Sequence, residues 1–375
     1  MSDFENEQIM YDIIITGGGL AGLVSSILLS KAGKKVLVIE KKKYPFHRVC
    51  GEYISNETRP FLKSIGLNFK ELNVKEIVKF QFTSPKGRKL ETNLDLGGFG
   101  ISRYQLDDTL FQLAQKNGVT FLLENTVESI DFQSDRFIVK THFETFNSRF
   151  VIGAFGKRTK LDATLQRDFF TKRSPYIGVK YHIKTDFPKD LIALHNFKDG
   201  YCGISAIEGD KYCLCYLTTR ENLRKHGTIA EMERNILWKN PHLQKIFTES
   251  EFLYEKPEVI NEISFAPKTT IENHILMVGD SAGLITPLCG NGMAIAIHGA
   301  KLLSESILEN FNDRGLVETN YQNRWKKHFS QRLWVGRIVQ KLFGNEVISE
   351  IAWGTLKIIR PALGVIIKAT HGKVF

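Results

Sequence analysis

The sequence lacks a long apolar run, paired cysteines and internal repeats, and each absence excludes a class of protein. No stretch of about 18 apolar residues is free of charges, so we predict no membrane-spanning helix. The five cysteines form no C-x-x-C pair and have no histidine at zinc spacing, which predicts free thiols in a reducing cytoplasm and no metal site. The first ten residues are acidic and polar, so we expect no secretory signal. These absences favour a cytoplasmic globular protein, and 375 residues suffice for two core-bearing units.

The net charge of +10 is the main compositional bias, and it could serve nucleic acid, a membrane surface or an anionic cofactor. No nucleic-acid-binding motif accompanies it, so we expect no nucleic-acid partner. Residues 321–375 hold ten Lys/Arg against two Asp/Glu and mix them with Trp325, Phe329 and Trp334. This pattern fits helices packed over the cavity of a soluble protein, which we favour, or an amphipathic helix in peripheral contact with a membrane.

A glycine turn near the N-terminus organises the chain. A short apolar run, which predicts a buried parallel strand, leads into Gly17, Gly19 and Gly22, a G-x-G-x-x-G pattern at the start of a helix. The first glycine allows a tight turn, the second lets the backbone approach a pyrophosphate, and the third packs the helix on the strand. The next buried strand ends at Glu40, 18 residues after Gly22, close to where an acid binds a ribose hydroxyl. The stretch therefore predicts a dinucleotide site.

The loop after Glu40 combines a base, a guanidinium and a thiol in His47, Arg48 and Cys50. Arg48 suits a pyrophosphate because its planar guanidinium offers a fixed fork of donors, although a solvated basic loop has the same composition. Cys50 is either small buried filler or a residue with a redox or substrate-contact role. His47 is either an ordinary loop histidine or a second candidate catalytic residue.

A helix is predicted from Ser102, where Ser102 and Gln105 form a capping-box pattern. Arg103 lies in its first turn, a position that the helix dipole disfavours for a cation unless an anion is near. A plain surface arginine is the alternative. Residues 176–218 then alternate and are rich in aromatics, so they predict an antiparallel sheet inserted as a substrate domain.

The nucleotide-binding pattern resumes near residue 275, where an apolar strand leads into Gly279-Asp280. Gly290, Asn291 and Gly292 then precede a helix. An acid at a strand end can hold a hydroxyl chain, and a glycine-rich helix start can stabilise negative charge on a neighbouring ring. Two glycine-flanked strand ends so far apart favour one cofactor site built from both parts of the chain.

These motifs resemble the successive FAD motifs of group A flavoproteins. That group has the para-hydroxybenzoate hydroxylase fold and includes aromatic hydroxylases, tryptophan halogenases and geranylgeranyl reductases. The resemblance covers about residues 10–310 and rests on the glycine turn, Arg103-x-x-Leu106-Asp107, residues 153–156 and residues 279–283. Carried over residue by residue, it implies FAD as the cofactor, with Gly17, Gly19, Gly22, Arg48 and Arg103 at the pyrophosphate, Glu40 at the adenosine ribose, Val127 at the adenine, Asp280 at the ribityl chain, and Gly290, Asn291 and Gly292 below the isoalloxazine. Leu20, Ala21, Lys41 and Gly279 are expected as further cofactor contacts.

The implied fold is α/β with an α+β insert. It comprises a Rossmann-like FAD-binding domain that is discontinuous in sequence, an antiparallel β-sheet substrate domain and C-terminal helices. We expect the FAD-binding domain in three parts, the substrate domain in two and one helical region, with boundaries at 1–74, 101–165 and 266–310, then 75–100 and 166–265, and finally 311–375.

Departures from the group limit the reaction. Phe155 stands where hydroxylases usually have the Asp of Gly-Ala-Asp-Gly, which leaves NADH or NADPH open as electron donor. The four tryptophans are scattered, so the paired-tryptophan motif of halogenases is absent. The Cys50-Gly51 loop is similar to that of geranylgeranyl reductases.

We predict an FAD-dependent monooxygenase that hydroxylates an apolar or aromatic metabolite through a flavin C4a-hydroperoxide. The alternative is a flavin-dependent reductase or dehydrogenase of the geranylgeranyl reductase type, acting on a prenyl or lipid-like alkene with Cys50 on the substrate side. A flavin-binding redox sensor without enzymatic activity is a third alternative.

Overall fold

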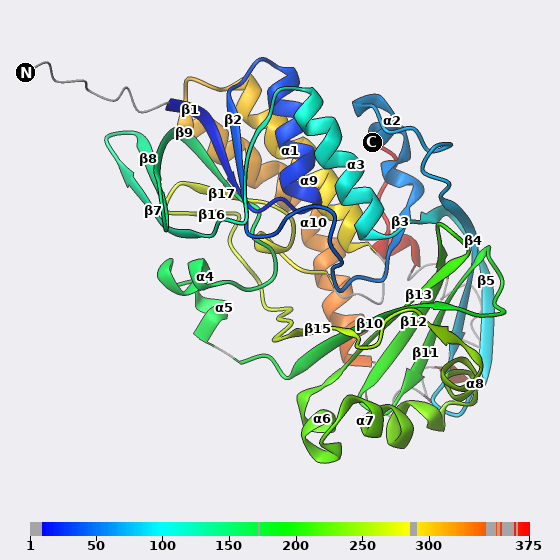
Figure 1. Ribbon diagram of the computed structural model, residues 1–375. Coiled ribbons are helices and arrows are strands. Elements are labelled where there is room, and N and C mark those ends of the chain that lie inside the picture. The colour runs from blue at the N-terminus through cyan, green and yellow to red at the C-terminus, as the bar shows by residue number, and fades with distance from the viewer. Residues whose placement is uncertain are drawn as a thin grey trace, which may run out of the picture.

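The protein was analysed as a computed structural model, which describes residues 10–171, 173–285, 291–342, 350, 353–354, 364 and 367–375. Two sheets dominate it. Figure 1 shows them in separate halves of the molecule, with long helices packed beside the upper sheet.

The first sheet is built on the strand that precedes the glycine turn. Its central strands are parallel: β1 pairs with β2 and β9, β2 with β6, and β9 with β17. Strand β1 is almost continuously buried because both of its faces are covered, as parallel sheets require. An antiparallel ribbon, β7 and β8, extends from β9. The strands are β1 (Met10–Thr16), β2 (Val36–Glu40), β6 (Thr120–Leu123), β7 (Val127–Gln133), β8 (Arg136–Thr141), β9 (Thr145–Gly153), β16 (Ile271–Glu272) and β17 (Ile275–Met277).

Helix α1 follows the glycine turn and packs against α3 and α9, and α10 packs against α9. Along α10, Trp325, Phe329 and Leu333 are buried, whereas Trp334 is 58% exposed, so this helix covers the core with one face. None of the helices in the described part of the chain combines the length and apolarity that crossing a bilayer requires. The helices of this half are α1 (Leu20–Lys31), α2 (Arg59–Ile65), α3 (Arg103–Lys116), α4 (Lys160–Thr164), α5 (Asp168–Thr171), α9 (Gly292–Glu309) and α10 (Arg314–Leu342).

The second sheet has the strand order β14-β10-β13-β12-β11-β4-β5-β3, with β15 added at β10. Its pairs are antiparallel except for β11 with β4. Three helices cover its far face, at the bottom of Figure 1: α6 (Arg220–His226), α7 (Ile229–Ile236) and α8 (Pro241–Glu249). The strands are β3 (Tyr53–Ser55), β4 (Lys75–Thr83), β5 (Lys89–Gly100), β10 (Tyr176–Lys184), β11 (Leu191–Phe197), β12 (Gly200–Ile207), β13 (Lys211–Thr219), β14 (Glu251–Phe252) and β15 (Glu258–Asn261). The two-sheet α/β fold confirms the predicted fold class.

Successive side chains of a strand point to opposite faces of the sheet, so every second residue of the second sheet faces the nucleotide-binding half. On β10, Tyr181 packs with the helix-side core, whereas Lys180 and His182 point the other way and bond to Glu52. On β13, Cys215 and Cys213 lie opposite Lys180 and His182 in the antiparallel register. One face of the sheet therefore builds its core, and the other carries polar and thiol groups toward the nucleotide-binding half.

The capping box predicted at α3 forms only in part. Ser102 Oγ accepts from the Gln105 N–H (3.1 Å), as expected. The Ser102 N–H, however, donates to Glu208 (2.7 Å), and the Gln105 side chain donates to the Leu72 carbonyl (3.3 Å). Glu208 follows β12, so an acid of the second sheet caps a helix of the first half and ties the halves together.

Candidate functional site

The three glycines of the turn differ in what surrounds them. A Cβ on Gly17, which has a φ of +104°, would lie 2.5 Å from the Ala154 carbonyl oxygen, and one on Gly22 would lie 2.1 Å from the Gly17 oxygen. Both are therefore glycine because the backbones pack closely. A Cβ on Gly19 would meet only the Arg103 guanidinium, at 3.8 Å. Gly19 thus leaves room on the cavity side, where a pyrophosphate would approach the start of α1.

Two acids and two arginines form a chain beside this turn. Glu40, at the end of β2, accepts from the Gly18 N–H (2.8 Å) and from Arg48 (3.2 Å). Arg48 also donates to Asp107 (3.2 Å), which receives two bonds from Arg103 (2.6 and 2.7 Å). The arginines are thus held over the turn by carboxylates, with donors left for an anion. Burial lowers the pKa of Arg103, but Asp107 outweighs this effect, so its pKa lies above the usual value.

Arg103 in the first turn of α3 was an anomaly in the sequence, and Asp107 supplies the partner. The i,i+4 spacing within the Arg-x-x-Leu-Asp motif is the signal in the sequence that points to Asp107.

A cavity of about 940 Å³ runs from this turn to the second sheet. Its nucleotide side includes most of the predicted FAD contacts: Gly17, Gly19, Leu20, Ala21, Glu40, Lys41, Arg48, Arg103, Val127, Gly279, Asp280 and Gly292. Gly22 lies behind the turn in its packing role. Asn291 is fully buried and does not line the cavity, because its amide donates to the Thr370 carbonyl (2.8 Å). The prediction for Gly290 falls outside the described residues.

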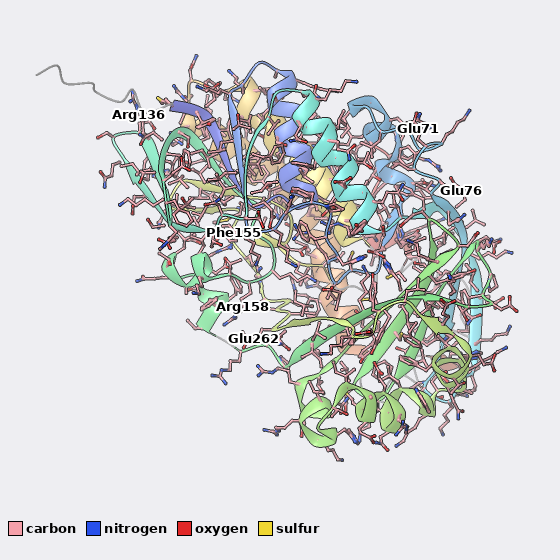
Figure 2. The ribbon with its side chains drawn as sticks, viewed as in Figure 1. Glu71, Glu76, Arg136, Phe155, Arg158 and Glu262 are labelled. Carbon is pink, nitrogen blue, oxygen red and sulfur yellow. The ribbon has the colours of Figure 1, made fainter. Side chains whose placement is uncertain are left out.

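Phe155 and Arg158, which are labelled in Figure 2, follow the end of β9 and line the cavity. Arg158 pairs with Glu262 (2.8 Å) and lies over the Phe170 ring (3.9 Å). Nearby, Lys268 donates to the carbonyl of Asp280 (2.8 Å), and burial lowers the pKa of this lysine to about 8. Lys268 also donates to the Lys157 carbonyl (2.7 Å), so it joins the segment after β9 to the Asp280 turn.

The opposite wall of the cavity is apolar and comes mainly from the second sheet. Among its lining residues are Phe80, Phe82, Leu94, Ile192, Leu194, Tyr201, Leu217, Ile260, Ile263 and Leu284. A cavity with a polar cofactor side and an apolar far side suits a substrate without charge.

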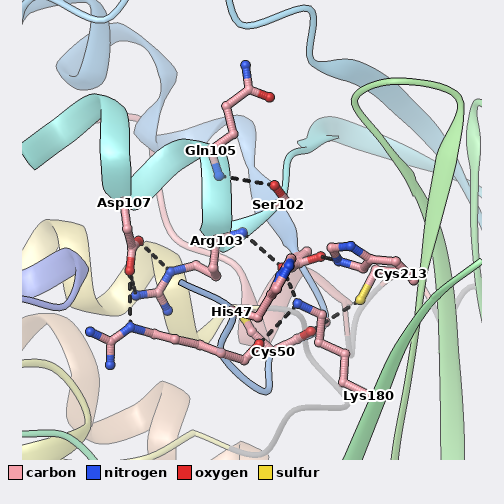
Figure 3. A network of polar contacts seen from close by, with 12 residues as sticks. His47, Cys50, Ser102, Arg103, Gln105, Asp107, Lys180 and Cys213 are labelled. Carbon is pink, nitrogen blue, oxygen red and sulfur yellow. Dashed lines mark hydrogen bonds and ion pairs between the residues drawn. The ribbon is translucent and has the colours of Figure 1, made fainter. Parts of the chain in front are cut away.

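A buried polar network lies between the two walls (Figure 3). Glu52 is fully buried and accepts from Lys180 (2.5 Å), from His182 Nε2 (2.6 Å) and from the Arg103 N–H (2.9 Å). Burial alone would raise the pKa of Glu52. The Lys180 ammonium and the His182 hydrogen bond outweigh this effect and lower the pKa to about 2. Tyr254 joins His182 Nδ1 (2.8 Å) to His47 Nδ1 (3.0 Å). Of the residues in this network, the sequence indicated His47 and Arg103, whereas Glu52, Lys180, His182 and Tyr254 were missed.

The second sheet also fixes the loop that carries Cys50. Three side chains of this sheet donate to backbone carbonyls of the loop. Lys180 bonds to the Arg48 oxygen (3.1 Å), Cys213 to the Cys50 oxygen (3.2 Å) and Ser205 to the Gly51 oxygen (3.4 Å). Figure 3 shows Lys180 and Cys213 reaching this loop. Cys50 itself is half-buried and lines the cavity.

His47 lines the same cavity and stacks on Tyr104 (4.7 Å between ring centroids). Burial, Lys180 and His182 lower the pKa of His47 to about 4, so it is neutral at pH 7.

Glu52, His182 and Cys213 place three potential metal ligands within 4.8 Å of one another. Each of the three already has a partner: Lys180 and His182 occupy the carboxylate, and the Cys213 thiol bonds to the Cys50 carbonyl. Burial raises the pKa of Cys213, which disfavours the thiolate that binds metals. The three residues act as a structural cluster.

The fold and the glycine-turn site together define a flavoprotein oxidoreductase of the Rossmann-like class. The sequence matches the family described as "FAD binding domain" over residues 10–326, and the chain belongs to that family. The protein is therefore an FAD-dependent oxidoreductase, and the open face of Gly19, the paired arginines and the depth of the cavity fit FAD.

The proteins that this chain resembles carry names of different functions. The chain is 26% identical to conditioned medium factor receptor 1 of Dictyostelium discoideum over 87% of this chain and 69% of that protein. It is 24% identical to digeranylgeranylglycerophospholipid reductase of Methanococcus vannielii over 90% of this chain and 88% of the relative. Among solved structures, the flavin-dependent brominase Bmp2 superposes with a TM-score of 0.80 at 18% identity, covering 98% of this chain and 94% of the brominase. At that identity the likeness shows the shared fold.

Proposed function

We propose that the protein is an FAD-dependent monooxygenase that hydroxylates a compact apolar or aromatic metabolite, with NADH or NADPH as electron donor. The observation that carries this proposal is the cavity, whose cofactor side is polar and whose far side is an apolar sheet face. In this proposal FAD would extend from Glu40 and Val127 to Asp280, which all line the cavity, and would take much of the space. The remainder suits a ring-sized substrate better than a long isoprenoid chain.

In this proposal FAD supplies the redox chemistry when bound, and the protein orients the reactants and excludes water. Gly19, Arg48 and Arg103 would hold the pyrophosphate, and Glu40 the ribose. The hydrogen bonds to the carbonyls of the Arg48–Gly51 loop would fix the position of Cys50 at the boundary between cofactor and substrate. The apolar side chains of the second sheet would pack against the substrate and hold it near the start of α9.

A reductase of alkenes is the second candidate, and Cys50 favours it. Its thiol lines the cavity in a loop held by three side chains of the substrate sheet, a placement suited to giving a proton to a substrate carbon. Such a reaction would add two hydrogens to the substrate and would need no oxygen.

One experiment separates the two. The FAD-loaded protein would be mixed with NADH or NADPH and a panel of phenols, naphthols and geranylgeraniol, with bromide included in one arm, under air and under argon. Oxygen uptake coupled to a product one oxygen atom heavier supports the monooxygenase. Turnover under argon to a product two hydrogen atoms heavier would establish the reductase. A brominated product would contradict both candidates and indicate a halogenase.

A further inference from the structure

Helix α10 packs on the core with one side and is exposed to solvent along the other. Its inner side adds Trp325 and Phe329 to the core of the nucleotide-binding half, and Val335 packs against the apolar cluster that contains Leu194 and Leu217 of the cavity wall. Figure 1 shows α10 in orange, running down from the upper half toward the second sheet. The outer side of α10 is therefore one helix away from the apolar wall of the cavity.

The outer side of α10 exposes a line of large apolar side chains. Leu316 is 49% exposed, Trp334 58% and Ile338 40%. Leu316 precedes the other two by 18 and 22 residues, so at about 100° per residue the three lie within about 40° of one another around the helix axis. Among the described residues, each of the other exposed large hydrophobics lies on a different segment. In that part of the chain, α10 alone collects them in a row.

The same side of α10 is basic. The helix contains seven Lys/Arg and a single acid, Glu318, whose carboxylate already has a histidine partner (2.8 Å). Lys327 lies on the apolar line, and Lys326 and Arg337 flank it. None of these three cations forms an ion pair with a residue that the structure describes. Their charges are therefore available to an anionic partner.

Apolar side chains and unpaired cations on one exposed side are typical of helices that lie in the interface of an anionic membrane. We propose that the outer side of α10 docks on a lipid bilayer that contains anionic lipid. The apolar line would enter the boundary between headgroups and acyl chains, where tryptophan is favoured, and the cations would bind lipid phosphates. Because α10 also supports the cavity wall, docking would bring the apolar side of the cavity next to the bilayer.

A bilayer fits this side better than the other partners that a basic surface can have. From Leu316 to Ile338 the line extends about 33 Å at about 1.5 Å per residue, and an extended plane contacts such a line along its whole length. A second copy of the chain would bring like charges together, which disfavours association. A nucleic acid would bind the cations but would leave the apolar line in water.

The test is sedimentation of the FAD-loaded protein with vesicles, without substrate or electron donor. One set is phosphatidylcholine alone, and the other contains about one third phosphatidylserine. We expect binding to the anionic set only, and its loss as salt is raised, because salt screens exposed charges. Tryptophan emission should shift to the blue on binding, since Trp334 is the most exposed of the four tryptophans.

Two substitutions on the line and two matched controls locate the contact. Trp334→Ser should weaken binding about ten-fold and remove the emission shift, and Lys327→Gln should weaken binding about five-fold. Phe143→Ser changes an aromatic residue that is 77% exposed at the β8–β9 turn, and Lys116→Gln changes an exposed lysine of α3. Both controls should bind like the wild type. All four side chains are exposed, so the melting temperatures should match that of the wild type.

The proposal is overturned if the protein does not sediment with anionic vesicles, if it binds phosphatidylcholine equally well, or if both substitutions on the line leave binding unchanged. Displacement from the vesicles by a DNA fragment, with binding of that fragment that depends on Lys327 but not on Trp334, would assign this side to nucleic acid instead. No turnover is measured, so the result is independent of the proposed function, and a failure of monooxygenation would leave it standing.

Discussion

Substitution of Lys180 by Met should destabilise the protein strongly, because it leaves a fully buried carboxylate without its cation. Lys180 and Glu52 are both fully buried and lie 2.5 Å apart. A carboxyl whose pKa falls from 4.5 to about 2 on folding gains about 3 kcal/mol at neutral pH. Breaking a buried pair by removing one partner typically costs about 3–5 kcal/mol. We therefore expect Lys180→Met to lower the free energy of unfolding by about 3 kcal/mol, since His182 and the Arg103 N–H remain.

Urea unfolding of the FAD-saturated protein, followed by tryptophan fluorescence, measures this loss. The double variant Lys180→Met with Glu52→Gln should recover part of it, because neither charge is then left alone. Lys79→Met is the matched control, since Lys79 pairs with Asp190 at the surface (2.8 Å) and should unfold like the wild type. If Lys180→Met unfolds like the wild type, or if the double variant loses as much as both single changes together, charge pairing does not hold Glu52.

The same network predicts a defined pH dependence. The folded pKa of Glu52 lies below its unfolded value, so its contribution is complete above about pH 4.5 and is lost as the pH falls toward 2. Glu52→Gln should lack this part of the acid sensitivity, and its urea midpoint should fall less than that of the wild type between pH 5 and pH 3. Parallel losses in the two proteins would contradict the assignment.

Three further outcomes follow from the site and the surface. Gly22→Ala should lower the free energy of unfolding by about 1–3 kcal/mol through overpacking, because its Cβ would lie 2.1 Å from the Gly17 oxygen, and thermal unfolding checks it. Gly19→Ala should unfold like the wild type but weaken FAD binding at least ten-fold by flavin fluorescence, because its Cβ would enter the pyrophosphate space. Trp334→Ser should reduce sedimentation with anionic vesicles, since this tryptophan is 58% exposed on a basic helix. Unchanged sedimentation would rule out membrane contact through this face.

Local features of the nucleotide site could be predicted from the sequence because local rules determine them. The strand before Gly17, the turn and the helix after it depend on neighbouring residues, and β1, α1 and β2 form where periodicity placed them. The acid at the end of β2 is buried beside the turn and accepts from the Gly18 N–H, and its predicted contact with a ribose hydroxyl stays a prediction. The assignment of FAD also needed the second motif at Gly279-Asp280, which lines the same cavity as the glycine turn.

The buried network could not be predicted because its members are distant in sequence. Glu52 lies 128 residues from Lys180 and 130 from His182, and only the fold decides that they meet. The signal available was the pair of polar residues at alternate positions in the apolar strand β10, which implies a common face but names no partner. Similarly, the apolar stripe of α10 has the same spacing whether it covers a core or a membrane, and here Trp325 and Phe329 pack inside.

The loop from Arg48 to Glu52 connects the nucleotide-binding half of the molecule to the second sheet. At its start Arg48 bonds to Glu40 and Asp107 on the nucleotide side, and at its end Glu52 bonds to Lys180 and His182 on the second sheet. Because both ends are fixed by charged partners, the middle of the loop keeps one position at the cavity for any reaction. In the proposed function the choice of substrate would then come from the facing wall, where the second sheet is apolar. Substitutions in that wall should change which compounds react, whereas substitutions at either end of the loop should impair every reaction alike.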